Sequence, residues 1–345
     1  MNCRSSLIAI FVVVFAFGCR GRNAARTELL SAGPSSSMAV GMREFALPIK
    51  EASGLSHYVD PQTGRRQILV VNDSDKKLLM VDYEKMQQGE LSFGGFDLGA
   101  MSRLPSQSSE ASSQWEAVFA DRQGRVYVSN EEASTIEIFD LAKKTRVGLI
   151  ELKIPSDDES LGDLKTSWEQ DPGSRVEGFI ILPNGHILAV KEKNPPLLIE
   201  FAPQGEKATG VKVDGSLINP SSDARQSELN SGINWPGRPD NKFVYHAKKI
   251  WSPASDYPAD LDISELAYTD RGELALLSDR LQTIFVLGSE LSLTERTFKI
   301  KEKLVLPSTA EKPEGLLFMP ASKVLIASDL QELKPNLFWI SWTRK

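Results

Sequence analysis

Five segments of the chain share one pattern of apolar and polar positions. Each begins with an acid or Ser and a small residue, runs through two apolar stretches separated by a turn with Asp, Asn or Gly, and ends on an acid. The segments are residues 53–73, 116–131, 177–192, 264–279 and 314–329. Turn residues flanked by β-forming residues predict a β-hairpin in each segment.

Further apolar runs extend each hairpin. Runs such as Ile136–Phe139 and Leu337–Ile340 predict a third strand, and a fourth fits residues 146–152, 208–213 and 297–300. The last unit lacks a fourth strand before the chain ends, and Arg43–Ile49 can supply it and close a ring. Repeated four-stranded antiparallel units are typical of propeller blades. The sequence therefore predicts an all-β fold, a β-propeller.

The spacing of the repeats bears on the number of blades. The starts of the five segments lie 63, 61, 87 and 50 residues apart. The gap of 87 is too long for one blade, yet residues 214–262 show one convincing strand, at Phe243–Ala247. This stretch is either a degenerate blade or an irregular insertion. We favour six blades over five.

The N-terminus has the order of a secretory signal. Arg4 precedes an apolar run, Leu7–Phe17, which is too short to span a bilayer as a helix. The run ends in Ala16-Phe17-Gly18-Cys19, which resembles a bacterial lipobox. We expect an acylated Cys19 that anchors the protein to a membrane. The alternatives are a signal cut elsewhere or a short uncleaved anchor.

These features predict three parts of the chain. Residues 1–18 are expected to be the signal peptide, residues 19–41 a flexible tether, and residues 42–345 the propeller with its irregular stretch at 214–262. The expected location is the bacterial cell envelope, as an outer-membrane lipoprotein that faces the periplasm or the surface.

Charge and residue types exclude some functions. The net charge of −6 gives nucleic acid no basic surface to bind. With three His and two Cys, of which Cys3 leaves with the signal, a zinc site is disfavoured. His57 and His186 are expected to be packed or solvent-facing. A hard cation with oxygen ligands, calcium, is the metal that the composition favours.

Strand pairing places the acids of the repeats. In an antiparallel hairpin the start of the first strand lies beside the end of the second, so both acids of every unit fall on one face. Candidate ligand-binding residues at this channel rim are Glu116, Glu177, Glu314, Glu131 and Glu192. The first three should lie deepest, because the innermost strands line the channel. Alternatively, these carboxylates accept backbone hydrogen bonds and fix the blade spacing. No catalytic residue is assigned.

The same pairing separates neutralised acids from like-charged pairs. It places Arg175 opposite Glu192 and Lys312 opposite Asp329, which predicts two cross-strand ion pairs.

Two other pairs bring like charges together. Asp262 falls opposite Asp279, and Glu51 falls near Asp73. Two close carboxylates must share a proton or a cation, so these four residues are the candidate calcium ligands, with Asp262 and Asp279 preferred. A register different by one residue, or simple exposure to water, would remove the conflict.

Several short motifs resemble a known family. They are Ser53-Gly-Leu, Trp115-Glu116, Val176-Glu177-Gly178, Glu192-Lys-Asn-Pro195, Asp262-Ile-Ser264, Leu277-Ser-Asp279 and Pro313-Glu314-Gly315. In this order they are similar to the blade motifs of the SdiA-regulated family, which is similar in turn to esterase-like phytase propellers. The resemblance covers residues 45–340 except 214–262. It implies a periplasmic or surface propeller with calcium as a candidate ligand, and phosphoester hydrolysis by analogy only.

Two functional hypotheses follow. The first is a lipid-anchored binding module for a cation, for an anionic small molecule held through that cation, or for another envelope protein. The second is an enzyme, a calcium-dependent phosphoesterase of the phytase-like kind.

Overall fold

The computed structural model describes residues 35–343, without 74–75, 103–113, 122, 157, 183, 213–240, 256, 259, 288–289 and 333. The expected signal peptide, Cys19 and the first half of the irregular stretch therefore lie outside the described residues. All strands belong to one compact unit, Pro34–Lys345.

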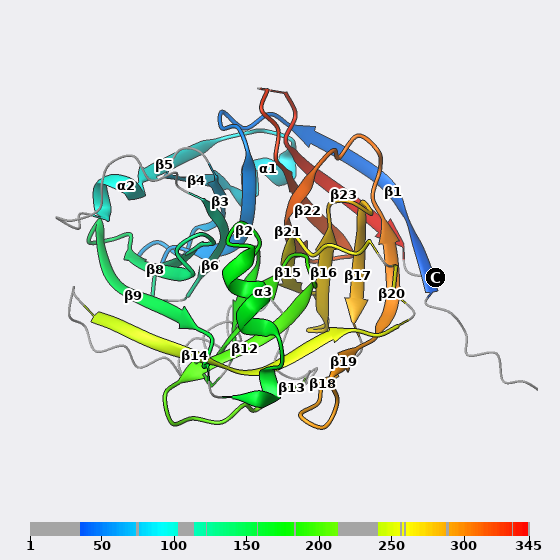
Figure 1. Ribbon diagram of the computed structural model, residues 1–345. Coiled ribbons are helices and arrows are strands. Elements are labelled where there is room, and N and C mark those ends of the chain that lie inside the picture. Colours follow the sequence, from blue (N-terminus) through cyan, green and yellow to red (C-terminus); the bar gives the residue numbers. More distant parts are fainter. Residues whose placement is uncertain are drawn as a thin grey trace, which may run out of the picture. The chain divides into compact units, whose positions relative to one another are not determined.

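The described strands form five four-stranded units (Figure 1). The first unit is β2 (Ala52–Val59), β3 (Arg66–Asn72), β4 (Lys77–Asp82) and β5 (Phe93–Asp97). The second is β6 (Trp115–Ala120), β7 (Arg125–Asn130), β8 (Thr135–Asp140) and β9 (Thr145–Lys153). The third is β10 (Phe179–Ile181), β11 (Ile187–Lys191), β12 (Leu197–Pro203) and β14 (Asn241–Pro253). The hairpins of all three follow the apolar pattern of the repeat.

The fourth unit is β15 (Glu265–Tyr268), β16 (Leu274–Ser278), β17 (Thr283–Leu287) and β20 (Ile300–Val305). The fifth is β21 (Pro313–Met319), β22 (Lys323–Ser328), β23 (Leu337–Thr343) and β1 (Ser35–Phe45). Two short strands, β13 (Val211–Lys212) and β18 (Glu290–Leu291), pair with each other, and β19 (Thr297–Phe298) pairs with β14. Short helices α1 (Tyr83–Gln88), α2 (Leu98–Met101), η1 (Glu159–Leu161) and α3 (Leu164–Gln170) lie between strands.

The first strands of the units pack on one another in a closed cycle. β2 packs against β6 and β21, β10 packs against β6 and β15, and β15 packs against β21. The sequence pattern thus predicted the fold class correctly, a propeller of four-stranded antiparallel units. The described residues supply five units, and the favoured count of six stays a prediction that they do not confirm.

The small residue near the start of the repeat allows the inner strands to approach closely. A Cβ on Gly315 would lie 2.0 Å from the carbonyl oxygen of Ser53 in the neighbouring unit. A Cβ on Gly54 would lie 2.6 Å from Cα of Ala117, and heavy atoms do not approach so closely. Glycine at these positions is therefore a requirement of packing around the ring.

The outer strands differ from the prediction in two units. The fourth strand of the fourth unit was expected at residues 297–300, but residues 297–298 pair with β14, and β20 takes the place beside β17. Residues 208–213 were expected to form the fourth strand of the third unit, but β14, from the irregular stretch, takes this place beside β12. Residues 211–212 pair instead with β18. Apolar residues of β14 such as Tyr245, Ala247 and Trp251 are buried, and this burial selects the distant segment over the adjacent one.

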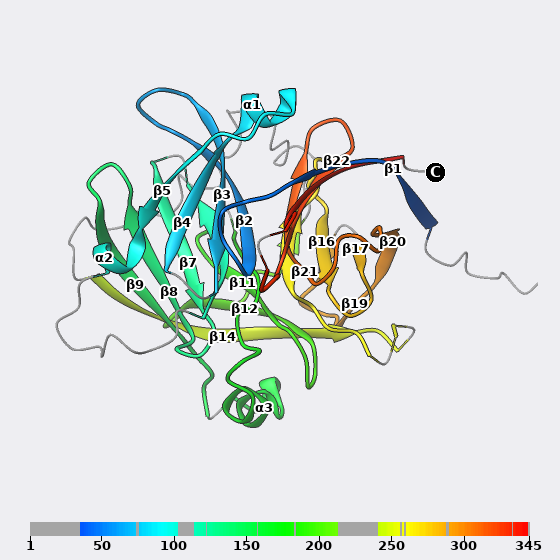
Figure 2. The same cartoon turned by 90° about the horizontal axis from the view of Figure 1, so that it is seen from above.

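The N-terminal strand completes the fifth unit as the sequence predicted, but it ends at Phe45 rather than at Ile49. β1 pairs antiparallel with β23, with Arg43 opposite Trp339 and Phe45 opposite Leu337. It begins at Ser35, within the range expected for the tether, and its first residues pair in parallel with β20. β9 and β14 form a similar parallel pair between the second and third units. Figure 2 shows β1 and β14 as long strands that run past several units.

Candidate functional site

The acids of the repeats gather on one face, as hairpin pairing predicted. In four units the amide of the acid after the second strand donates to a carbonyl before the inner strand. These bonds are Asp73 to Glu51 at 3.2 Å, Glu131 to Gln114 at 3.2 Å, Glu192 to Ser174 at 2.9 Å and Asp329 to Lys312 at 3.0 Å. We call the carboxyl groups at this face the acidic rim: Asp73, Glu116, Glu131, Glu177, Glu192, Asp279, Glu314 and Asp329.

Acids from different units repel one another across the rim. Burial raises the pKa of Glu177 well above its ordinary value, and repulsion from Glu116, Glu131 and other rim acids adds to the effect. Burial likewise raises the pKa of Glu116 well above the ordinary value, with repulsion from Glu314 and Glu131, whereas a hydrogen bond with Ser53 opposes it. Burial and mutual repulsion therefore favour the protonated form of these inner carboxyl groups.

Glu131 and Glu177 form a directly interacting pair. Their side chains share a hydrogen bond, so one of the two carries a proton. Burial, followed by repulsion from Glu192, raises the pKa of Glu131 to about 7, although the hydrogen bond with Glu177 lowers it. Glu131 is only 6% exposed, and its Oε2 atom is buried without a hydrogen-bond partner among the described residues. An orphaned carboxylate oxygen at this depth is a ready acceptor for a cation or a donor group.

The depth order differs partly from the prediction. Glu116 is 8% exposed, as expected for an inner-strand acid, but Glu131 from the end of a second strand is equally buried. Glu177 and Glu314 keep intermediate solvent exposure. Glu314 nevertheless has a pKa raised well above its ordinary value, through burial and then repulsion from Asp329 and Asp279.

One of the two predicted ion pairs is confirmed. Lys312 Nζ lies 2.8 Å from Asp329 Oδ2. The pair of Arg175 with Glu192 is wrong, because Ser174 rather than Arg175 lies opposite Glu192. The Arg175 guanidinium donates instead to the carbonyls of Trp168, at 2.6 Å, and of Glu132, at 3.0 Å. Lys193 forms the ion pair with Glu192.

The two acids of the preferred calcium pair, Asp262 and Asp279, influence each other electrostatically. Burial, and then repulsion from Asp262, raises the pKa of Asp279. Asp262, however, accepts hydrogen bonds from the Ser278 hydroxyl and, at 3.0 Å, from the amide of Arg280. Asp262 therefore already has protein donors, which reduces its need for a cation.

The second pair behaves similarly. Burial, and then repulsion from Glu51, raises the pKa of Asp73. Gln114 donates to Asp73 at 3.2 Å, and Gln331 donates to Glu51. Among the described residues, no group of three or more His, Cys, Asp or Glu side chains is arranged to hold a metal ion. A calcium ion at either pair would need additional ligands or a rearrangement of the rim.

Sequence reasoning missed Glu265. It is 3% exposed at the start of β15, and burial raises its pKa well above the ordinary value. Its Oε1 accepts a hydrogen bond from the amide of Leu266 at 2.9 Å. A Cβ on Gly178 would lie only 2.5 Å from this oxygen atom. The signal was present in the sequence, since Ser264-Glu265-Leu266 has an acid at the place where other repeats have Gly or Ala.

The connection from β9 to β10 lies against the acidic rim. A Cβ on Gly173 would come within 3.8 Å of Glu131 Oε1. The fully buried Lys191 donates to the hydroxyl of Ser174 at 3.2 Å, and Asn194 donates to Asp171 at 3.0 Å. Figure 2 shows α3, from the same connection, outside the sheets on one side. This connection thus covers part of the rim and holds Glu131 away from solvent.

No helix among the described residues is long and apolar enough to cross a membrane. No protein-family model matches the chain, and no curated protein matches its sequence.

Solved structures of propeller-like proteins are similar to the chain at low identity. A virginiamycin B lyase from Staphylococcus aureus is 12% identical with a TM-score of 0.42, over 87% of this chain and 99% of that one. A calcium-binding regucalcin from Agrobacterium tumefaciens is 10% identical with a TM-score of 0.44, over 89% and 95%. A gluconolactonase from Xanthomonas campestris is 12% identical with a TM-score of 0.43, over 88% and 89%.

Proposed function

We propose that this protein is a propeller binding module whose acidic rim takes up a cation, with calcium as the first candidate. The observation that carries the proposal is the buried Oε2 of Glu131, which has no hydrogen-bond partner among the described residues and lies among carboxyl groups of other units with raised pKa values. Buried polar atoms are normally satisfied, so an orphaned oxygen among acids favours an external partner. Glu116, Glu177, Glu192 and Glu314 carry further oxygen atoms of the kind that calcium prefers, and these side chains must rearrange to hold one ion together.

The raised pKa values predict how such binding depends on pH. A cation must displace the protons that Glu131 and Glu177 hold in its absence. Each displaced proton makes affinity rise by up to about tenfold per pH unit below the pKa of the group. Calcium should therefore bind more tightly at pH 8 than at pH 6 and release protons as it binds.

The experiment is calorimetric titration of residues 20–345 with calcium chloride at both pH values, in buffers of different ionisation enthalpy. Calcium at 100 times its dissociation constant should add about 2.7 kcal/mol to the free energy of unfolding. Glu131→Gln should weaken binding, whereas Glu311→Gln, which changes an exposed acid paired with Lys334, should not. The proposal fails if calcium gives no heat and no thermal shift, or if both variants bind alike.

A phosphoesterase is the second candidate, because the amino groups of Lys193 and Lys312 lie beside Glu192 and Asp329 at the rim. A cation held by carboxylates with lysines beside it offers a place for a phosphate group. Purified residues 20–345 with p-nitrophenyl phosphate and a phosphodiester panel, with and without calcium, distinguish the two candidates. Calcium-dependent turnover abolished by Glu177→Gln would establish the enzyme, and no turnover would leave the binding module.

The proposal includes a location in the cell envelope, an acylated Cys19 and membership in the SdiA-regulated family. The order of the motifs in the sequence supports the family membership. The short apolar run before Cys19 supports the acylation and the location. Cells fed a clickable palmitate should label the wild-type protein and not Cys19→Ala. Equal labelling of both proteins would show that Cys19 is not the anchor.

A further inference from the structure

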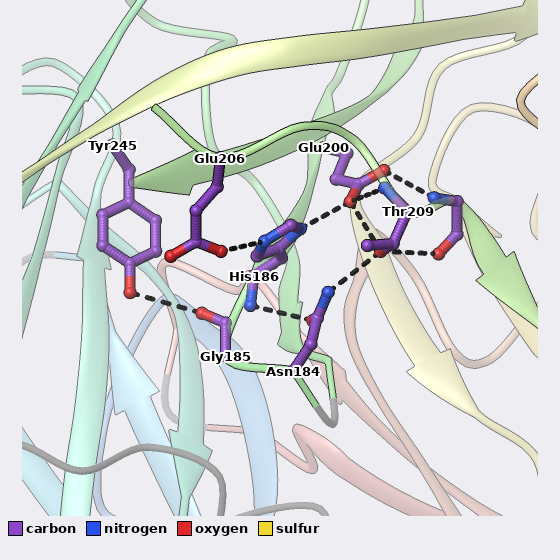
Figure 3. Close-up of polar contacts among 8 residues, drawn as sticks. Asn184, Gly185, His186, Glu200, Glu206, Thr209 and Tyr245 are labelled. Carbon is purple, nitrogen blue, oxygen red and sulfur yellow. Dashed lines mark hydrogen bonds and ion pairs between the residues drawn. The ribbon is translucent and has the colours of Figure 1, made fainter. Parts of the chain in front are cut away.

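A buried histidine of the third unit lies between two carboxylates, directly before β11 (Figure 3). His186 is 2% exposed, and its Nδ1 lies 2.7 Å from Glu200 Oε1. Its Nε2 lies 2.9 Å from Glu206 Oε2. A neutral imidazole has one N–H and one lone pair, so it can donate to only one of two carboxylates. The two short contacts therefore fit a doubly protonated, charged ring.

The two carboxylates are held very differently. Glu200 is fully buried and also accepts hydrogen bonds from the amide of Thr209 at 2.8 Å, its hydroxyl at 3.0 Å and the amide of Gly210 at 3.0 Å. The Glu206 side chain is 54% exposed, and its contact with His186 fixes its position. If the ring loses one proton, Glu200 keeps three donors. Glu206 would then face a lone pair and separate.

We propose that His186, Glu200 and Glu206 form a pH-sensitive latch, which fixes the loop of residues 204–208 at acidic pH and releases it at alkaline pH. The loop leads directly into β13, which pairs with β18 near the fourth unit. Thr209 and Gly210 keep their hydrogen bonds to Glu200, so release is confined to the loop and leaves the pairing of β13 with β18 in place. This role is separate from cation binding at the rim.

The surrounding groups agree with this direction. Burial acts to lower the pKa of His186, but the hydrogen bonds with Glu200 and Glu206 outweigh it, and the pKa is raised. Burial acts to raise the pKa of Glu200, but His186, Thr209 and Gly210 lower it. Tyr245 also packs here, donating to the carbonyl of Gly185 at 3.3 Å, and its pKa is raised to about 12. Tyr245 therefore stays neutral while His186 titrates.

The sign of the effect follows from linkage. A histidine whose pKa is raised by folding contributes stability that is complete below its ordinary pKa of 6.5. That contribution is lost as pH rises through the pKa of the folded state. The latch is therefore closed below about pH 6.5 and opens as the pH rises above that value.

Trypsin provides a readout, because the exposed Lys207 lies in the middle of the loop. Cleavage there needs the loop to leave its fixed conformation. Lys144, in the turn between β8 and β9, is an internal reference that removes the pH dependence of trypsin itself. The ratio of cleavage after Lys207 to cleavage after Lys144 should rise between pH 6 and pH 9, because His186 loses the proton that holds Glu206.

Two variants and one spectrum test the latch. Glu206→Gln, an exposed position that should fold normally, should give a high ratio at pH 6 that no longer changes with pH. Glu311→Gln should behave as wild type. Nitrogen-15 shifts of the His186 ring should show a charged imidazole that titrates above 6.5. A constant wild-type ratio, a wild-type response of Glu206→Gln, or a neutral ring at pH 6 would each overturn the proposal.

Discussion

Removing β1 should cause the largest loss of stability of any short truncation. Deleting residues 20–45 should lower the melting temperature by on the order of 10 °C, or precipitate the protein, because it exposes the edges of β23 and β20. It also removes the buried Phe45 and the hydrogen bond of 2.6 Å from Ser37 to Glu302. Burial of one Phe side chain alone contributes about 2 kcal/mol. Thermal melts and light scattering are the measurements.

Two matched controls separate closure of the fifth unit from loss of the N-terminal residues. Deleting residues 20–34 should leave the melting temperature unchanged, because β1 begins at Ser35. Within the strand, Phe45→Ala should destabilise, whereas Val40→Ala, at a side chain that is 67% exposed, should not. Similar melting of the two truncations would contradict a role of β1 in closing the ring.

Glu131→Gln should stabilise the protein at pH 8. The folded state raises the pKa of Glu131 from 4.5 to about 7, so this carboxyl binds its proton more tightly when folded. Its contribution is complete below pH 4.5 and is lost as pH rises to about 7. Gln keeps the shape of the protonated acid without that loss. We expect a gain of about 1–3 kcal/mol at pH 8 and almost none at pH 4.

The measurement is urea unfolding of both proteins at pH 4, 6 and 8 without calcium. Glu132→Gln is the matched control, since Glu132 is the next residue and is exposed. It should leave stability unchanged at every pH. A loss of stability in Glu131→Gln at pH 8 would mean that this side chain is needed for packing in its charged form. If Glu131→Gln raises the free energy of unfolding and also weakens calcium binding, then Glu131 favours calcium binding and lowers stability.

Local pairing explains what the sequence could predict. The alternation of apolar residues and the turn residues define each hairpin, and hairpin register then places Asp329 beside Lys312 and Asp262 near Asp279. Such contacts join residues close in the chain, so their geometry follows from strand pairing alone. The predicted ion pair of Arg175 with Glu192 was wrong because the chain before β10 is not a regular strand. The pairing there is shifted by one residue, so Ser174 lies opposite Glu192.

Contacts between distant segments could not be predicted in the same way. The choice of β14 over residues 208–213 depends on how well Trp251 and Tyr245 are buried, which no repeat pattern reports. The association of His186 with Glu200 and Glu206 depends on how the loop after β12 folds back. Glu265 is a different case. Its position in the repeat can be read from the sequence, but its burial cannot.

The two long outer strands make the five units mechanically unequal. β14 joins the second and third units by pairing with β9 and β12, and it also pairs with β19, which directly precedes β20 of the fourth unit. β1 joins the fourth and fifth units. Among the described strands, β5 has no partner beyond its own unit. Main-chain hydrogen bonds therefore link the second to fifth units to one another, whereas side-chain packing links the first unit to its neighbours. A force that pulls the ring apart must break the former around four units and the latter around the first. The first unit is the natural place for the ring to open.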